Sequence, residues 1–276
     1  MTGPVIAVVL PAYNAAAYLE EAIRSVLVQT FSDFELIIID DCSSDETFSI
    51  AQRFASEDSR IRVIRNETNQ KEGGSRNIGI ASVSPSVRYI ATMDADDCCR
   101  KDRLQKQLDF LDKHREIAFC GAAIAIMDDS GCIFAEREYP SGGKCIRRNF
   151  GAFNCFAHPT TMLRRELFQT YRYEPTHRCV DYALFFQILE HHDGDNLPDV
   201  LLDYRLSSTQ QKSRYLKETL LDTIRIQRPH LFERRFFRFR NVLVWCLELV
   251  LYCLPNPLVL YLFQKKYFRQ SKGYAR

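Results

Sequence analysis

Up to about residue 110 the chain alternates short apolar runs with stretches in which apolar residues recur at helical spacing. The first pattern predicts strands buried on both faces, and the second predicts helices packed against them. We expect strands at 5–10, 35–39, 61–64 and 87–93. We expect four helices: one at 18–29, one that begins at 43 and runs past 54, one that follows residues 73–74 and ends at 80, and one around 104–111. This alternation predicts an α/β fold with a mostly parallel sheet and helices on both faces.

Polar residues and glycines suggest where three of these helices begin. Asn14 stands just before the first helix as a candidate cap, and Ser43 and Glu46 have the spacing of a capping box. Gly73-Gly74 is expected to form a turn before the helix that runs to residue 80.

After residue 115 the rhythm changes. Apolar residues at 119–127 and 132–134 flank a turn, which predicts an antiparallel hairpin. A Gly/Phe-rich loop, a strand at 160–163, a helix at 181–191 and a last strand at 200–206 are expected to follow. We therefore expect one domain in two halves, 1–115 and 116–215, and then a helical tail at 216–276.

Composition restricts the class of protein only loosely. Of the 276 residues, 46% are hydrophobic and 26% are charged, which is ordinary for a globular protein. The 10 Cys include no C-x-x-C pair, which favours free thiols in a reducing compartment over disulfides or zinc. The N-terminus shows no signal-peptide pattern, so we expect a cytoplasmic protein.

Acidic residues follow two of the predicted strands. In a parallel sheet ligands bind beyond the carboxyl ends of the strands, which here carry Asp40-Asp41 and the cluster Asp94, Asp96 and Asp97. Such carboxylates repel one another unless they are solvated, protonated or neutralised, and oxygen ligands suit Mg²⁺ or Mn²⁺ shared with a substrate phosphate. An isolated D-x-D is more often a solvated turn, and Asp40-Asp41 with Ser43 is equally a capping loop. Convergence on one rim favours the metal and phosphate interpretation.

Four segments in register resemble the inverting glycosyltransferases of family 2, which have the GT-A fold with a Rossmann-like sheet and a mixed acceptor-side region. The segments that carry the resemblance are Leu10-Pro11-Ala12-Tyr13-Asn14, 25–43 with Asp40-Asp41-Cys42-Ser43 at its end, Gly73-Gly74-Ser75-Arg76-Asn77-Ile78-Gly79, and Asp94-Ala95-Asp96-Asp97. The chain departs from the family at Cys42, where relatives usually have Gly.

The resemblance implies a role for each matching residue. Asp41 and its neighbour Asp40 would contact the base or ribose of a nucleotide-sugar donor, and Asp94 would face the ribose. Asp96 would ligate Mn²⁺ or Mg²⁺, with Asp97 nearby. The other residues assigned to the donor pocket are Pro11, Tyr13, Asn14, Arg76, Asn77 and Ala95.

The acceptor side carries weaker signals. Asp181, in Val180-Asp181-Tyr182, resembles the Asp of the family's Glu-Asp-Tyr motif, which acts as general base; Val180 replaces the Glu, and a plain helix cap is the alternative. His158 resembles an acceptor-side residue, although a lone His is usually structural. Arg205, with Gln210-Gln211 beyond it, is expected to reach the diphosphate or to form a surface ion pair.

The reaction implied is a single displacement that moves a sugar from a nucleoside-diphosphate sugar, UDP-sugar first, to a hydroxyl of a glycan or lipid-linked acceptor in cell-surface polysaccharide or glycolipid synthesis. A sugar nucleotidyltransferase would need a Gly-rich basic loop after the first strand, and 11–17 contains neither Gly nor a basic residue. A dehydrogenase is disfavoured because no G-x-G-x-x-G follows that strand. A degenerate membrane-associated scaffold remains an alternative, on account of Cys42 and Val180.

The tail is basic and apolar. Residues 225–276 carry 11 Lys or Arg and 2 Asp or Glu, a balance of +9, and the remainder carries −7. The apolar runs at 242–254 and 258–263 are shorter than the about 18 residues that span a bilayer, and Glu248 and two prolines interrupt them. We expect helices in an anionic membrane interface, peripheral on the inner face of the cell membrane. Packing on the body or in a homo-oligomer is the alternative, and nucleic acid is disfavoured because no recognition module is present.

Overall fold

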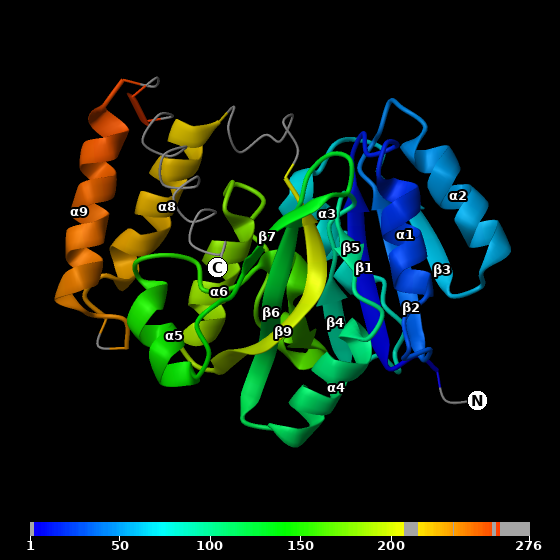
Figure 1. Ribbon diagram of the computed structural model, residues 1–276, viewed down its shortest axis with the longest axis horizontal. Coiled ribbons are helices and arrows are strands. Elements are labelled where there is room, and N and C mark those ends of the chain that lie inside the picture. The colour runs from blue at the N-terminus through cyan, green and yellow to red at the C-terminus, as the bar shows by residue number, and fades with distance from the viewer. Residues whose placement is uncertain (1–2, 207–214, 234, 256–257, 260–276) are drawn as a thin grey trace.

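The computed structural model describes residues 3–206, 215–233, 235–255 and 258–259 (Figure 1). In this part of the chain nine strands form one sheet in the order β3-β2-β1-β4-β8-β6-β9-β5, with β7 paired to β6. The strands are β1 (Ile6–Ala12), β2 (Phe34–Asp40), β3 (Ile61–Arg65), β4 (Tyr89–Thr92), β5 (Cys98–Cys99), β6 (Ile117–Met127), β7 (Ile133–Arg137), β8 (Met162–Arg164) and β9 (Asp193–Arg205). The helices are α1 (Leu19–Leu27), α2 (Thr47–Glu57), α3 (Lys71–Ala81), α4 (Arg103–Lys113), α5 (Gly143–Phe150), α6 (Val180–Leu189), α8 (Leu216–His230) and α9 (Phe239–Cys253), with 3₁₀ turns η1 (His158–Thr160) and η2 (Arg165–Gln169).

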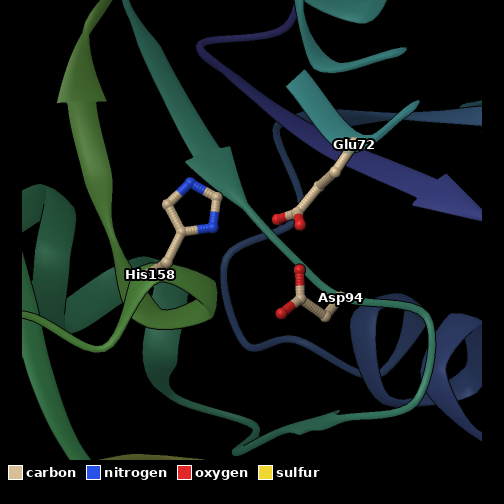
Figure 2. Close-up of side chains that lie close together, drawn as sticks. All are labelled: Glu72, Asp94 and His158. Carbon is tan, nitrogen blue, oxygen red and sulfur yellow. The ribbon is translucent and has the colours of Figure 1, made fainter. Parts of the chain in front are cut away.

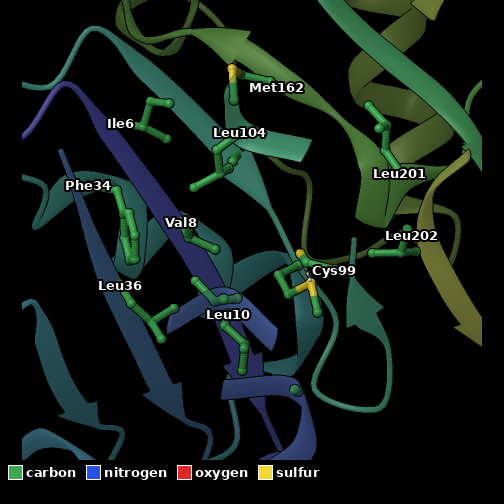
Figure 3. Close-up of a cluster of buried hydrophobic side chains, with 14 of the residues drawn as sticks. Ile6, Val8, Leu10, Phe34, Leu36, Cys99, Leu104, Met162, Leu201 and Leu202 are labelled. Carbon is green, nitrogen blue, oxygen red and sulfur yellow. Dashed lines mark hydrogen bonds between the residues drawn. The ribbon is translucent and has the colours of Figure 1, made fainter. Parts of the chain in front are cut away.

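The first four strands form the parallel part of the sheet, as the sequence predicts. β1 pairs in parallel with β2 and β4, and β3 pairs in parallel with β2. Successive residues of β1 serve the two faces, because side chains alternate along a strand. Val8 lies in the hydrophobic cluster of one face with Leu36 and Leu104 (Figure 3), whereas Val9 lies in the cluster of the other. Helices cover both faces, so the strands are continuously apolar.

The second half extends the same sheet with mixed pairing. β8 is antiparallel to both β4 and β6, β6 is parallel to β9, and β5 is antiparallel to β9. The predicted hairpin is present as β6 and β7. The architecture is the α/β sheet with a mixed second region that the sequence predicts.

The expected caps of the first two helices are wrong. α2 begins at Thr47, whose backbone N–H donates to Asp45 Oδ1 at 3.0 Å, and no capping box forms. The Ser43 hydroxyl instead accepts from the backbone N–H of Asn14 at 3.0 Å, and Asn14 Oδ1 accepts from the N–H of Ser44 at 2.9 Å. These polar side chains join the loops after β1 and β2, because each loop has backbone groups that lie outside its strand.

Gly73 and Gly74 lie inside α3 rather than in a turn before it. A Cβ on Gly73 would lie 3.1 Å from Val180 Cγ1 and 3.4 Å from Tyr173 Cβ. Glycine therefore lets the segment from Tyr173 to Val180 pack closely on the start of the helix.

Three further expectations need correction. The Gly/Phe-rich loop contains α5, whose Ile146 and Phe150 are buried. The strand expected at 160–163 is a 3₁₀ turn followed by β8. β9 begins at Asp193 rather than 200, because its first half carries Asp, Asn and Pro and lacks the apolar pattern of a buried strand.

Within the described residues, the tail contains the two helices α8 and α9. α8 and α9 lie side by side at the end of the molecule opposite α2 (Figure 1). No helix in the described ranges is long and apolar enough to cross a membrane. The expected contribution of Gln210-Gln211 and most of the second apolar run at 258–263 lie outside the described residues.

Candidate functional site

The loops after β1, β2 and β4 meet at one edge of the sheet. Besides the Asn14 contacts, the N–H of Asp41 donates to the carbonyl of Ala12 at 2.8 Å, and the N–H of Met93 donates to that of Val9 at 3.1 Å. Pro11 lies near the end of β1, and the next side chain beyond that strand, Tyr13, is 49% exposed. The edge is therefore a connected rim with an aromatic side chain available to a ligand.

Asp40 and Asp41 are both buried, with 0% and 3% exposure. The Asp40 carboxylate lies 3.2 Å from Arg65 Nε. Asp41 Oδ1 accepts from Asn66 Nδ2 at 2.7 Å and from the backbone N–H of Gln70, the N-cap of α3, at 2.8 Å. Asp40 thus faces a neighbouring strand, whereas Asp41 lies between the rim and α3.

Arg76 is the electrostatic centre of the rim. Its guanidinium is 1% exposed and pairs with Asp94 and, at 3.2 Å, with Glu72. Burial alone would lower the pKa of Arg76, but the negative charges of Asp94 and Glu72 outweigh burial and raise its pKa. One buried cation therefore holds two carboxylates at the end of β4.

His158 faces the same two carboxylates (Figure 2). Ligand atoms of Glu72, Asp94 and His158 lie within 4.8 Å of one another, a spacing that could hold a metal ion. Arg76 already offsets the charge of both carboxylates, so a cation would compete with a buried guanidinium there.

Tyr173 connects His158 to α3. Its hydroxyl lies 2.8 Å from His158 Nε2, and the phenol is buried, which raises its pKa and keeps it neutral. Asn77 makes two bonds to the backbone of Tyr173: its Nδ2 donates to the carbonyl at 2.8 Å, and its Oδ1 accepts from the N–H at 3.1 Å. Asn77, expected in the donor pocket, thus has its amide engaged with the protein backbone.

Asp181 lies in the first turn of α6 and is half-buried. Asn154 Nδ2 donates to Asp181 Oδ2 at 2.8 Å. The charge of Asp181 contributes to the raised pKa of the Tyr173 phenol, for which burial is the main cause. The helix N-terminus favours the ionised form that a general base needs.

The loop from Asp94 to Asp97 is held from beneath by Arg205. The backbone N–H of Arg205 donates to Asp97 Oδ1 at 2.8 Å, and its side-chain Nε donates to the carbonyl of Asp96 at 2.9 Å. The remaining guanidinium nitrogens contact Glu21 and the carbonyls of 128–129. Arg205 is 1% exposed, supports the loop and pairs with the exposed Glu21, as the ion-pair alternative expects, and the diphosphate contact stays a prediction.

The carboxylates of this loop differ in exposure. Asp97 is 1% exposed and bonded to Arg205, Ala95 is buried, and Asp94 and Asp96 are half-buried. Carboxylate oxygens suit Mg²⁺ or Mn²⁺ with a phosphate as further ligand, and because Asp94 pairs with Arg76, Asp96 is the candidate metal ligand of this loop. A second candidate group, Glu190, His230 and Glu233, lies far along the chain between α6 and α8, where two ion pairs at 2.9 Å engage the imidazole.

Three residues of the site were missed from the sequence: Glu72, Asn154 and Tyr173. Glu72 precedes Arg76 by four positions, so helical spacing could have indicated the ion pair. No local pattern marks Asn154 or Tyr173, because their roles depend on packing between distant segments.

Comparison with known proteins gives a consistent result. The family model described as "Glycosyl transferase family 2" matches residues 7–172. The chain is 34% identical over 219 residues to "Putative glycosyltransferase EpsE" of Bacillus subtilis, covering 77% of each chain. It is 30% identical over 217 residues to "UDP-Glc:alpha-D-GlcNAc-diphosphoundecaprenol beta-1,3-glucosyltransferase WfgD" of Escherichia coli, covering 77% of this chain and 81% of that one.

Solved structures share the fold at low identity. The structure of S. aureus TarS 1-349 with UDP-GlcNAc aligns at a TM-score of 0.69 and 18% identity, over 89% of this chain and 71% of that one. The mannosyltransferase PcManGT from Pyrobaculum calidifontis with GDP-Man and Mn²⁺ aligns at a TM-score of 0.64 and 14% identity, over 94% of this chain and 72% of that one.

Proposed function

The chain belongs to glycosyl transferase family 2, and from this membership we propose that it moves a sugar from a nucleoside-diphosphate sugar to an acceptor hydroxyl with inversion at the anomeric carbon. The observation that carries the proposal is the meeting of Arg76, Asp94 and His158 at the strand-end rim, where Tyr173 contacts His158. A UDP-sugar donor is supported by the TarS complex with UDP-GlcNAc and by the UDP-Glc substrate in the name of WfgD.

The donor half of the proposal rests on the rim. Asp41 is proposed to face the base or ribose, and Asp94, held by Arg76, to face the ribose. Tyr13 offers an exposed ring at the mouth of the same edge. Asp40 and Asn77 act through the protein around them, because their side chains are engaged with Arg65 and Tyr173.

Asp96 would hold Mn²⁺ or Mg²⁺, while Asp94 is paired with Arg76. When bound, such an ion supplies positive charge beside the diphosphate leaving group. A neighbouring structure contains Mn²⁺ with GDP-Man, which supports a divalent ion in this fold. Arg205 and Asp97 keep the loop in place for that ligand set.

Asp181 is proposed to take the proton from the attacking hydroxyl. Asn154 fixes one of its oxygens, and α6 favours its charged form. The Glu that relatives place before this Asp is Val180 here, which is buried against α3, so Asp181 acts without a carboxylate neighbour in that position.

The acceptor is proposed to be a glycan on a lipid carrier, in cell-surface polysaccharide synthesis. WfgD is named for a diphosphoundecaprenol-linked acceptor. We also propose that the C-terminal tail keeps the enzyme beside that acceptor at the cytoplasmic membrane surface.

The test measures the rates of sugar transfer and donor hydrolysis with Mn²⁺ for the wild type, for Asp96→Asn and for a matched control, Asp109→Asn. Asp109 is an exposed carboxylate of α4. Asp96→Asn should lower the rate by about a hundredfold or more, whereas the control should leave it unchanged. Equal rates for all three proteins would refute the metal role of Asp96. A wild-type protein that binds a nucleotide sugar but transfers nothing would favour the scaffold alternative.

A further inference from the structure

α9 presents its polar side to the protein. Asn241 is 1% exposed, and its Nδ2 donates to the carbonyl of Phe236 at 3.0 Å. Trp245 Nε1 donates to the carbonyl of Ile224 at 3.0 Å, and one carboxylate oxygen of Glu248 is buried. Positions 241, 245 and 248 lie on one side of a helix, so this side holds α9 to the body.

The opposite side of α9 is apolar and exposed. Phe239, Leu243, Leu247 and Val250 lie about half a turn from the polar side, with exposed fractions of 72%, 54%, 58% and 58%. Asn241 is the one buried residue of this helix. A surface helix of a globular protein normally has the reverse arrangement, with its apolar stripe against the core.

Two aromatic rings continue this surface at the N-terminal end of the helix. Phe232 and Phe237 are 76% and 44% exposed, and their rings stack at 6.3 Å. We call the set Phe232, Phe237, Phe239, Leu243, Leu247 and Val250 the α9 face. An exposed apolar surface of this kind marks an interaction site.

Exposed cations lie beside the α9 face. Arg238 and Arg240 flank its start, and Arg240 reaches α5 through a 2.7 Å bond to Asn149 Oδ1. α5 adds the exposed Lys144 and Arg148. Between residues 235 and 255 the sequence contains a single acidic residue, Glu248, on the opposite side of the helix.

We propose that the α9 face lies in the interfacial layer of an anionic membrane, with Arg238 and Arg240 at the headgroup phosphates. This inference deepens the proposed function, on which it rests for the lipid-linked acceptor. A second copy of the chain fits less well, because the α9 face carries no acidic side chain that could pair with Arg238 and Arg240 of the other copy. An anionic bilayer matches both the apolar stripe and the cations.

The test is sedimentation of the full-length protein with vesicles of equal parts phosphatidylcholine and phosphatidylglycerol. Leu243→Glu/Leu247→Glu should weaken binding at least about tenfold. The matched control Val28→Glu/Phe134→Glu replaces exposed apolar residues on other elements and should bind like the wild type. Arg238→Ser and Arg240→Ser should each weaken binding to these anionic vesicles about fivefold, and should not change binding to vesicles of phosphatidylcholine alone.

Wild-type protein that stays in solution, or equal binding by Leu243→Glu/Leu247→Glu, would overturn the proposal. So would a dimer that only this variant dissociates, because the α9 face would then be a contact between copies. Sedimentation needs no donor, and transfer to a short soluble acceptor should survive all these substitutions. Loss of vesicle binding and loss of chemistry are therefore separate results.

Discussion

At the scale of single residues, the rim is organised by buried polar groups whose partners come from distant segments. Arg76 neutralises Asp94, Tyr173 contacts His158, and Asn77 holds the backbone of Tyr173. Buried polar groups cost free energy unless they are bonded, so each of these contacts constrains the next.

Tyr173→Phe tests that constraint. The substitution removes the hydroxyl beside His158 Nε2 and should lower the free energy of unfolding by about 1–3 kcal/mol, because a buried imidazole nitrogen loses its partner. Tyr171→Phe makes the same chemical change in the same segment, at a residue that is 9% exposed. It should lower the free energy of unfolding by less than Tyr173→Phe does. Urea denaturation of both variants measures the difference, and equal midpoints would exclude a structural role for the hydroxyl.

Cys42 occupies a backbone conformation that favours glycine. Its φ is 65°, in the left-handed region that glycine adopts without strain, which agrees with the Gly that the family resemblance leads us to expect after Asp41. Cys42→Gly should raise the free energy of unfolding by up to about 1 kcal/mol, and Cys42→Val should lower it by about 1–2 kcal/mol because a β-branched side chain fits this region poorly. Thermal or urea unfolding gives the order, and a stable Val variant would contradict it.

Motifs identified the acidic residues of the rim but not the direction of every side chain. The structure brings Arg76 into contact with Asp94, and Asp96 lies on the same loop, whereas their roles toward a donor and a metal stay predictions. The sequence did not show that Arg205 turns beneath the loop, because that contact depends on how β9 pairs with β5.

At the scale of elements, close packing of α3 on the sheet fixes the rim. A Cβ on Gly79 would lie 2.6 Å from Ile39 Cδ1 and 2.7 Å from Val9 Cγ1, both buried in the sheet. The helix therefore approaches β1 and β2 at a distance that only glycine permits.

Gly79→Ala should lower the free energy of unfolding by about 1–2 kcal/mol, because overpacking outweighs the gain in helix propensity. Gly143→Ala in α5 is the matched control. Its Cβ would meet the flexible end of Arg147 at 3.3 Å, so little change is expected. Calorimetry of both variants checks this, and a Gly79→Ala protein as stable as wild type would show that α3 can move away from the sheet.

The predicted strands and helices of the first half are confirmed because β1, β2 and β4 are apolar on both faces and α1, α2 and α4 each bury an apolar stripe. β9 and α5 were harder to predict for a physical reason. β9 carries Asp193, Asn196 and Pro198 in its first half, and α5 is short, with Ile146 and Phe150 as its buried residues. Their structure comes from neighbours rather than from local pattern.

At the scale of the whole molecule, one sheet runs through both halves of the chain. β8 inserts beside β4, and β5, though early in the chain, pairs only with β9 among the described strands. The alternation of strands and helices predicts the parallel part, but it contains no information on which late strand joins which early one.

The bonds that Arg205 makes to the loop of Asp96 and Asp97 form only late in synthesis of the chain. Asp97 and Arg205 are 108 positions apart, so the loop is synthesised well before the arginine that supports it. Until β9 has been made, the loop lacks the bonds that Arg205 provides. A chain that ends before β9 therefore lacks the contacts that support this loop.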